Sequence, residues 1–232
     1  MTSFEEQQVI IDATGIEKAY PSRSGRLEVL RGVDLRVLRG TVLAIHGVSG
    51  VGKSTLLNIL GTLDHADRGT LQIRGRPVDA MSEADLAAFR ARHLGFVFQF
   101  HHLLPEFSAE ENVMMPLVIA GMKRAEALDR AHAALSSAGL EARWTHLPAQ
   151  LSGGEAQRVA VARALVGKPD LVLADEPSGN LDHAAAESLH DLMRSLASET
   201  KQTFVIVTHN DRLAVIADRV MRLEAGHLVP VR

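Results

Sequence analysis

The sequence contains no cysteine, one tryptophan and one tyrosine, and its charges nearly cancel to a net value of −3. Without cysteine there are no disulfides, thiolate metal sites or cysteine nucleophiles, which is compatible with a reducing compartment. The small negative charge gives no support for a nucleic-acid-binding surface. No run approaches the roughly 18 apolar residues that cross a bilayer, and the acidic residues 1–6 lack the apolar core of a signal peptide. Any membrane role is therefore expected to come through a partner.

The remaining composition is that of an ordinary globular protein, with 46% hydrophobic and 23% charged residues. A chain of 232 residues can form one large domain or a domain with an inserted lobe. Residues 41–46 favour a strand, and continuous apolar runs at residues 171–174 and 203–207 predict strands buried in a parallel sheet. A helical pattern at residues 184–198 separates the last two strands, which favours βαβ units and an α/β fold.

Other segments depart from this alternation. Residues 9–13 favour a strand, and the polar turn at residues 21–26 indicates a small antiparallel sheet. Residues 79–92 predict a solvated amphipathic helix. Between about residues 100 and 165 strand signals vanish, and helices are predicted at residues 109–120, 124–138 and 154–166.

We therefore expect a helical subdomain inserted into an α/β core. The expected bounds are a single domain over residues 9–229, with its core at about residues 9–98 and 168–229 and its helical subdomain at about residues 99–167.

A glycine-rich loop follows the strand predicted at residues 41–46 and opens a predicted helix. It is a full match to G-x-x-x-x-G-K-S, formed by Gly47, Val48, Ser49, Gly50, Val51, Gly52, Lys53 and Ser54. In such a loop the glycines let backbone N–H groups converge on phosphate oxygens at a helix N-terminus. Lys53 would pair with the β- and γ-phosphates, and the Ser54 hydroxyl would bind Mg²⁺. Thr55 would add a contact to the α-phosphate.

Two carboxylates, Asp175 and Glu176, end the strand predicted at residues 171–174. The carboxyl ends of such strands are where α/β sheets bind ligands. Asp175 suits a carboxylate that holds Mg²⁺ through water, and Glu176 suits the residue that polarises the attacking water. Taken alone, the pair is equally compatible with acidic helix caps before Pro177, but the upstream phosphate loop favours the functional interpretation.

Three single residues extend this site. His209 follows the strand at residues 203–207 and is placed to contact a γ-phosphate. Gln99 follows the apolar strand at residues 94–98 and can reach Mg²⁺ or the attacking water through its amide oxygen. Tyr20 can stack on an adenine ring, although a tyrosine packed in a core is the commoner case.

A second glycine-rich loop, LSGGE at residues 151–155, contains Ser152, Gly153 and Gly154. One nucleotide needs only one phosphate-binding loop, so a chain with two different loops of this kind indicates that nucleotide binds between two copies of the chain. In their order along the chain, these motifs resemble the ABC-transporter ATPase subunits from about residue 9 to residue 229. LSGGE is highly specific, because other P-loop classes lack it.

The resemblance implies a P-loop ABC ATPase domain with a mostly parallel core sheet, an antiparallel β subdomain and the inserted helical subdomain. It also implies a head-to-tail homodimer that binds ATP and Mg²⁺, with the metal held by Ser54, Gln99 and Asp175, partly through water. Ser152, Gly153 and Gly154 of one copy would bind the γ-phosphate held by Lys53 of the other. Residues 180–182 would line the dimer seam.

Within that family, EPSGNLD at residues 176–182 resembles the group of LolD, MacB and FtsE proteins, and residues 95–107 look most like LolD. This implies an ATPase peripheral to the cytoplasmic face of the inner membrane, in a complex that releases lipoproteins for sorting to the outer membrane. Permease subunits similar to LolC and LolE would contact residues 99–107. One departure is Ala156, where LolD-like chains often carry arginine or glutamine.

Other functions stay open at this point. A MacB-like exporter or an FtsE-like division complex would use the same ATPase motifs. A soluble ABC protein of DNA repair or translation usually carries long coiled-coil or zinc-bearing insertions, or two cassettes, and this sequence has neither. A small-molecule kinase would not explain residues 151–155. The adjacent His101 and His102 make a poor metal pair, because no carboxylate or cysteine accompanies them.

Overall fold

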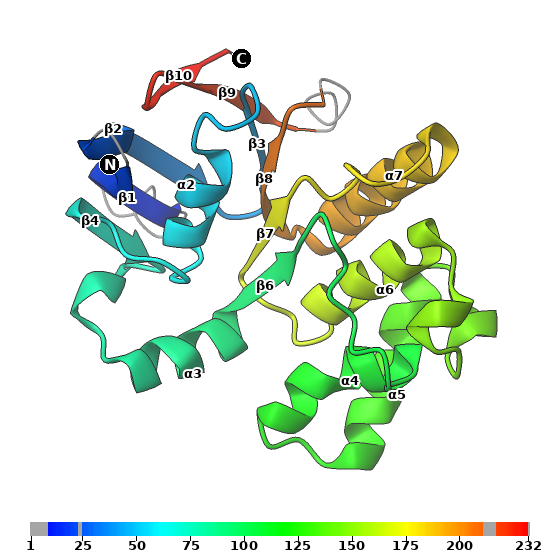
Figure 1. Cartoon of the computed structure of the whole chain (residues 1–232). Helices are drawn as coiled ribbons and strands as arrows, with labels where there is room; N and C mark the ends of the chain where they lie inside the picture. The colour runs from blue at the N-terminus through cyan, green and yellow to red at the C-terminus, as the bar shows by residue number, and fades with distance from the viewer. Residues whose placement is uncertain (1–8, 23–24, 211–216, 232) are drawn as a thin grey trace.

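A six-stranded sheet lies at the centre of the molecule and positions the loops described below. The structure is a computed structural model that describes residues 9–22, 25–210 and 217–231. The strand order is β10-β9-β3-β8-β7-β6 (Figure 1). The strands are β3 (Val42–His46), β6 (Leu94–Val97), β7 (Leu171–Asp175), β8 (Thr203–Thr208), β9 (Arg219–Glu224) and β10 (His227–Pro230). All neighbouring pairs are parallel except β9 and β10, which are antiparallel.

The central strands are covered on both faces. In β7, the side chains from Leu171 to Ala174 are all fully buried, and β8 is buried along its whole length. Strands with two covered faces need continuous apolar runs, because neither face can carry polar side chains into water. The parallel sheet predicted from these runs is confirmed.

A second, antiparallel sheet has the order β2-β1-β4-β5. It consists of β1 (Val9–Ser22), β2 (Gly25–Leu38), β4 (Arg68–Ile73) and β5 (Arg76–Pro77). In β2, Val33, Leu35 and Val37 are buried while the residues between them are exposed, so one face of this sheet packs on the core. The predicted antiparallel pair is confirmed, but β1 runs well beyond residue 13 because it pairs with β2 as far as Ser22.

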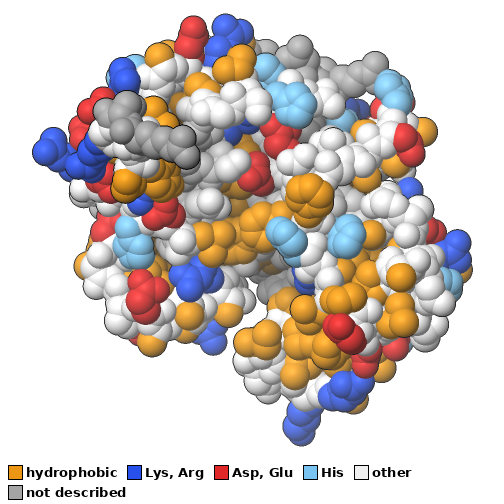
Figure 2. Space-filling model, viewed as in Figure 1, with side chains coloured by type: hydrophobic (Ala, Val, Ile, Leu, Met, Phe, Trp, Pro, Cys, Tyr) orange, Lys and Arg blue, Asp and Glu red, His pale blue; other side chains and the backbone are white. Residues whose placement is uncertain are grey.

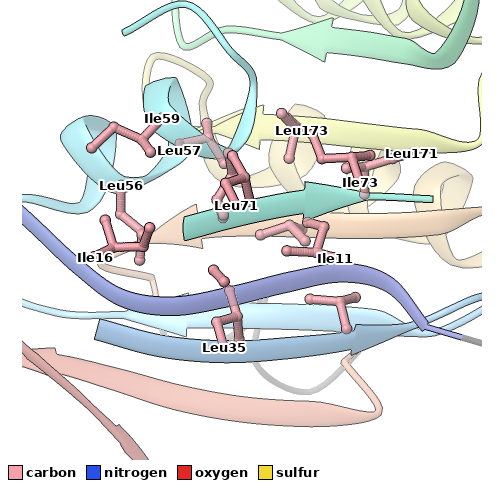
Figure 3. Close-up of a cluster of buried hydrophobic side chains, with 14 of the residues drawn as sticks. Ile11, Ile16, Leu35, Leu56, Leu57, Ile59, Leu71, Ile73, Leu171 and Leu173 are labelled. Carbon is pink, nitrogen blue, oxygen red and sulfur yellow. The ribbon is translucent and has the colours of Figure 1, made fainter. Parts of the chain in front are cut away.

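Helix α2 (Lys53–Leu60) joins the two sheets through a shared hydrophobic core. Figure 3 shows its apolar side chains pointing toward both sheets. This packing holds the start of α2 at the end of β3. The labelled members of the cluster are Ile11, Ile16, Leu35, Leu56, Leu57, Ile59, Leu71, Ile73, Leu171 and Leu173.

Three helices form a separate lobe between β6 and β7, which we call the helical lobe (residues 99–167). They are α4 (Ala109–Ile119), α5 (Arg124–Ser137) and α6 (Gly153–Leu165), and they have their own buried cluster (Figure 1). Helix α7 (His183–Thr200) packs on the central sheet through Leu189 and Met193. The expected α/β architecture with an antiparallel sheet and inserted helices is confirmed, and the domain bounds stay a prediction.

One expected element differs in the structure. The helix predicted over residues 79–92 is α3, and it begins only at Glu83, where Ser82 caps it by accepting a hydrogen bond from the Asp85 N–H. Asp79 lies instead in a short 3₁₀ turn (Val78–Ala80), and its carboxylate accepts a hydrogen bond from the Leu71 N–H at 2.7 Å. The prediction was wrong there because tertiary contact with β4 takes up the Asp79 side chain.

Among the described residues, no helix combines the length and the apolar character that crossing a membrane requires.

The shared core provides a direct test of this architecture. Leu173 is fully buried in the core cluster, so we expect Leu173→Ala to lower the free energy of unfolding by about 2–5 kcal/mol. Urea denaturation measures this change. Leu27→Ala is the matched control, because Leu27 is 58% exposed, and it should shift stability by no more than about 0.5 kcal/mol. Equal effects of the two changes would contradict the packing described here.

Candidate active site

The first glycine-rich loop connects β3 to α2, as its sequence predicts. Gly50 and Gly52 have φ angles of 79° and 109°, a region that side chains other than glycine rarely adopt. A Cβ atom at Gly52 would lie 2.5 Å from Val29 Cγ1, and one at Gly47 would lie 2.8 Å from the Leu223 carbonyl oxygen. The loop therefore requires glycine at both ends, and α2 begins directly after it at Lys53. Its backbone N–H groups can converge on an anion there.

Lys53 is a buried cation in this loop. The side chain is 6% exposed, and Nζ donates hydrogen bonds to the carbonyl oxygens of Gly47 at 2.9 Å and Val48 at 3.2 Å. A carboxylate oxygen of Glu176 lies 3.5 Å from Nζ. Burying an ammonium group is costly unless it is hydrogen-bonded and paired with negative charge. The loop thus holds a positive charge suited to an anionic group.

Asp175 ends β7 beside this loop, and its carboxylate has spare capacity for a ligand. Atom Oδ1 is buried and has no hydrogen-bond partner among the described residues. Burial raises the pKa of Asp175 above its ordinary value, and a hydrogen bond with Ser54 opposes this rise. An unsatisfied carboxylate oxygen next to a hydroxyl is a suitable pair of ligands for Mg²⁺, which prefers oxygen. Since no group of three His, Asp or Glu side chains forms a metal cage in the described part of the chain, further ligands would have to come from phosphate and water.

Glu176 is held by three neighbouring groups. Its Oε2 accepts hydrogen bonds from the Thr208 hydroxyl at 3.0 Å and the His209 N–H at 3.2 Å, and His209 Nδ1 lies 2.8 Å from Oε1. Burial acts to raise the pKa of Glu176, but the hydrogen bonds from His209 and Thr208 outweigh it and keep the pKa below its ordinary value. Glu176 also has a φ of 44°, which is unusual for a residue other than glycine. The carboxylate is therefore fixed in its charged form near Lys53.

Gln99 and Tyr20 lie at different borders of this site. The Gln99 side chain donates to Asn180 Oδ1 at 3.0 Å, and Asn180 Nδ2 donates to the Gln99 carbonyl at 3.2 Å. The Tyr20 hydroxyl donates to Asp64 at 2.8 Å and also interacts with Thr55, near the start of α2. Tyr20 is 36% exposed, so it is not a packed core tyrosine. Its predicted contact with adenine and the predicted metal contact of Gln99 stay predictions.

The second glycine-rich loop lies on the helical lobe. Ser152 caps α6 in a capping box, in which its hydroxyl accepts from the Glu155 N–H and Glu155 Oε2 accepts from the Ser152 N–H. Gly153 and Gly154 form the first turn of α6, and a Cβ at Gly154 would lie 3.0 Å from Ala185 Cβ. The result is a partly exposed helix N-terminus, which is a favourable place for an anion.

The two glycine-rich loops do not meet within one chain. In Figure 1 the start of α2 and the start of α6 lie well apart, with β7 between the two helices. Among the described residues, no hydrogen bond or ion pair joins residues 152–154 to residues 47–54. The structure therefore brings together Lys53, Ser54, Asp175, Glu176 and His209, and leaves the second loop apart from this cluster.

The comparisons with known proteins agree with this arrangement. The ABC transporter family model matches residues 30–179. The lipoprotein-releasing system ATP-binding protein LolD of Porphyromonas gingivalis is 53% identical over 95% of this chain and 99% of its own length. The corresponding LolD protein of Geobacter metallireducens is 49% identical over 95% of this chain and 98% of its own. This chain belongs to the LolD family of ABC transporter ATP-binding proteins.

A solved structure shows how a related cassette assembles. The dimeric ATP-binding cassette MJ0796, in a post-hydrolysis state bound to ADP and Pi, has a TM-score of 0.87 and 35% identity over 96% of this chain and 99% of its own. Another dimeric structure of MJ0796 gives a TM-score of 0.88 at 36% identity, with the same coverage. The two glycine-rich loops therefore belong to a fold that forms dimers in this relative.

Sequence reasoning missed several residues that surround this candidate site. Thr208 holds the Glu176 carboxylate, and its position next to His209 at the end of β8 was an available signal. Arg143 donates to Glu155 at 2.8 Å from a short turn outside every motif, so nothing in the sequence pointed to it. Glu176 and His209 also line a hollow of about 280 Å³ with Ser178 and Glu187. That hollow lies on the Glu176 and His209 side of the cluster.

The capping box of α6 should be visible in the pH dependence of stability. The Ser152 N–H and then Arg143 lower the pKa of Glu155 from 4.5 to about 2. Because the folded-state pKa is depressed, the ionised carboxylate stabilises the fold above pH 4.5, and this stabilisation is lost as the pH falls toward 2. We expect Glu155→Gln to be less stable than the wild type at pH 7, with the gap narrowing below pH 4.5. Thermal unfolding of both proteins across that pH range measures the difference in stability. A difference that does not change with pH would contradict the hydrogen bonds described for Glu155.

Proposed function

We propose that this chain is the ATP-hydrolysing subunit of an ABC transporter complex that releases lipoproteins from the inner membrane for sorting to the outer membrane. The observation that carries the ATPase activity is the cluster of Lys53, Glu176 and His209 at the carboxyl ends of parallel strands, with distances of 3.5 Å and 2.8 Å to the Glu176 carboxylate. Membership of the LolD family supports the lipoprotein-releasing role.

ATP would bind with its phosphates in the first loop. Backbone N–H groups of residues 47–54 and the Lys53 ammonium would hold the β- and γ-phosphates, Thr55 would contact the α-phosphate, and Tyr20 would stack on adenine. Ser54 and Asp175, with Gln99, would hold Mg²⁺ partly through water. When bound, the metal neutralises charge that develops on the phosphate oxygens.

Glu176 and His209 would carry out the hydrolytic step. The ionised Glu176 would orient a water molecule toward the γ-phosphorus and accept its proton. As the water oxygen bonds to the γ-phosphorus, the bond to the β–γ bridging oxygen would break, and ADP and phosphate would be released. Thr208 and His209 hold the carboxylate in one orientation. Because Nδ1 of His209 is engaged by Glu176, its Nε2 would be left for a hydrogen bond with a γ-phosphate oxygen. Lys53 would move from its carbonyl partners and Glu176 to the phosphates.

The γ-phosphate would complete the site across a homodimer. Ser152, Gly153 and Gly154 of a second copy would supply the α6 N-terminus to the γ-phosphate, and residues 180–182 would lie along the seam. ATP would then hold two copies together, and hydrolysis would remove the bridge and let them separate. The separate half-sites within one chain support this arrangement.

A membrane partner would bind on the helical-lobe side of the molecule. Phe100, Leu104 and Ile119 are 65%, 40% and 72% exposed. A largely apolar hollow of about 230 Å³ lies beside them, lined by Ala91, Leu104, Asn112, Met115, Pro116, Ile119 and Arg163. Figure 2 shows the surface hollowed between the regions of α3 and α4, with hydrophobic side chains along the rim. An exposed apolar patch with a hollow is typical of a protein interface. Permease subunits similar to LolC and LolE would dock there and keep the chain at the cytoplasmic face of the inner membrane.

Glu176→Gln tests this function, because it keeps the shape of the side chain and removes the base. We expect ATP affinity to remain at the wild-type level, hydrolysis to fall by about 10²- to 10⁴-fold, and ATP to trap the dimer. Lipoprotein release from membranes that contain the complex should stop. ATP turnover, size-exclusion chromatography and a release assay provide the three readouts.

Glu187→Gln is the matched control, since Glu187 lines the same hollow but its side chain is 55% exposed, and it should hydrolyse ATP at the wild-type rate. Wild-type turnover by Glu176→Gln would show that Glu176 is not the base. Lost turnover with unchanged lipoprotein release would overturn the transport role.

A further inference from the structure

The segment at residues 99–107, which carries Phe100, Leu104 and Phe107, has no regular secondary structure between β6 and α4. Its backbone carbonyl groups therefore need partners outside any helix or sheet ladder. Asn180 supplies the partner of the Gln99 carbonyl, and side chains of two helices of the lobe supply several of the others. We call residues 99–107 the docking segment.

Asn112 on α4 holds the second half of the docking segment. The residue is 1% exposed, its Nδ2 donates to the Leu104 and Phe107 carbonyls, and its Oδ1 accepts from the Leu104 N–H at 2.7 Å. Since α4 directly follows the segment, these hydrogen bonds are local. They shape the segment but connect it to nothing distant.

Helix α6 holds the first half of the docking segment. Gln157, which is 2% exposed, donates to the Phe98 carbonyl at 2.8 Å. Arg163 donates from Nη1 to the His102 carbonyl and from Nη2 to the His101 carbonyl, both at 2.7 Å. These two side chains bracket Gln99, and both stand on the helix whose first turn is the second glycine-rich loop.

The Arg163 contact depends on the shape of the guanidinium group. His102 has a φ of 46°, and its carbonyl and that of His101 accept from the two terminal nitrogens of one planar fork. A lysine ammonium is a point charge on a flexible stem and cannot reproduce this paired geometry. Arg163 is half-buried, and it lies in α6 near the end opposite to Gly153.

Helix α6 is continuous over 13 residues, from Gly153 to Leu165. At 1.5 Å per residue it is a stiff rod of about 20 Å. A displacement of the docking segment would therefore reach residues 152–154 through this one helix, provided that Arg163 keeps the segment attached to it. The Gln99 side chain bonds to Asn180, so the same segment also touches the predicted dimer seam.

We propose that Arg163 is a positioning residue that couples the docking segment to residues 152–154 through α6. This inference rests on the proposed function, since it takes the docking segment as the site of the membrane partner. Arg163 contacts neither the first glycine-rich loop nor the second. Its loss should leave ATP hydrolysis by the isolated chain intact and weaken the response of hydrolysis to the partner.

The test compares wild type, Arg163→Lys and Arg163→Ala, each as the isolated chain and in the complex with its co-purified membrane partner in lipid vesicles. In the isolated chain we expect kcat and KM for ATP to stay at wild-type values. In the complex, the stimulation of hydrolysis by the partner and its lipoprotein cargo should fall by about 2- to 30-fold. The loss should be greater for Arg163→Ala than for Arg163→Lys, which keeps one hydrogen-bonding cation. The stimulation is compared per bound partner, because Arg163 also lines the hollow at which the partner would dock.

Arg130→Ala is the matched control, because Arg130 lies on α5 in the same lobe and its side chain is 45% exposed. It should leave both activities unchanged. If Arg163→Ala does not fold, as judged by thermal unfolding, Arg163→Lys carries the comparison. Equal losses in the isolated chain and the complex, or full stimulation in a folded variant, would overturn the coupling role. A wild-type complex without any stimulation would overturn the proposed function, and this inference with it.

Discussion

The parallel pairing of β3, β8 and β7 is the constraint on which the whole site depends. Its register places His46 opposite Thr208, and Val207 opposite Asp175. The three strands therefore end at one edge, and the residues that follow them meet there. Because β3, β7 and β8 are buried on both faces by apolar side chains, this edge is held by the core and not by the polar groups themselves.

Charge balance at that edge explains why the polar groups can remain buried. Lys53 is hydrogen-bonded to two carbonyls and lies near Glu176, while Thr208 and His209 satisfy the other carboxylate oxygen. Asp175 keeps one unsatisfied oxygen. Buried polar groups normally have partners, so this oxygen marks the point where an additional ligand is most favourable. Lys53 and Glu176 thus have partners within the chain, and the Asp175 Oδ1 atom is left for a bound ligand.

Much of this site was predictable from the sequence because its motifs are contiguous and follow recognisable strands. Residues 47–54 and the pair Asp175 and Glu176 each follow an apolar run, so their place at the carboxyl edge follows from the topology of parallel sheets. The start of α3 was predicted too early, because the contact between Asp79 and β4 joins residues from different elements. Arg143 and Arg163 were missed for the same reason. Their partners are a carboxylate and two carbonyls brought near by folding.

The central claim is that the second glycine-rich loop completes the site of another copy. Because the native chain has no cysteine, a chain carrying Val48→Cys and Ala149→Cys has no other thiol. Val48 is 73% exposed and Ala149 is exposed beside the second loop, so both changes fit the folded chain and leave residues 152–154 unaltered. In the Glu176→Gln background, oxidation with ATP should give a covalent dimer on non-reducing gels, and oxidation without ATP should not. A disulfide within one chain, or no cross-link with ATP bound, would contradict the account.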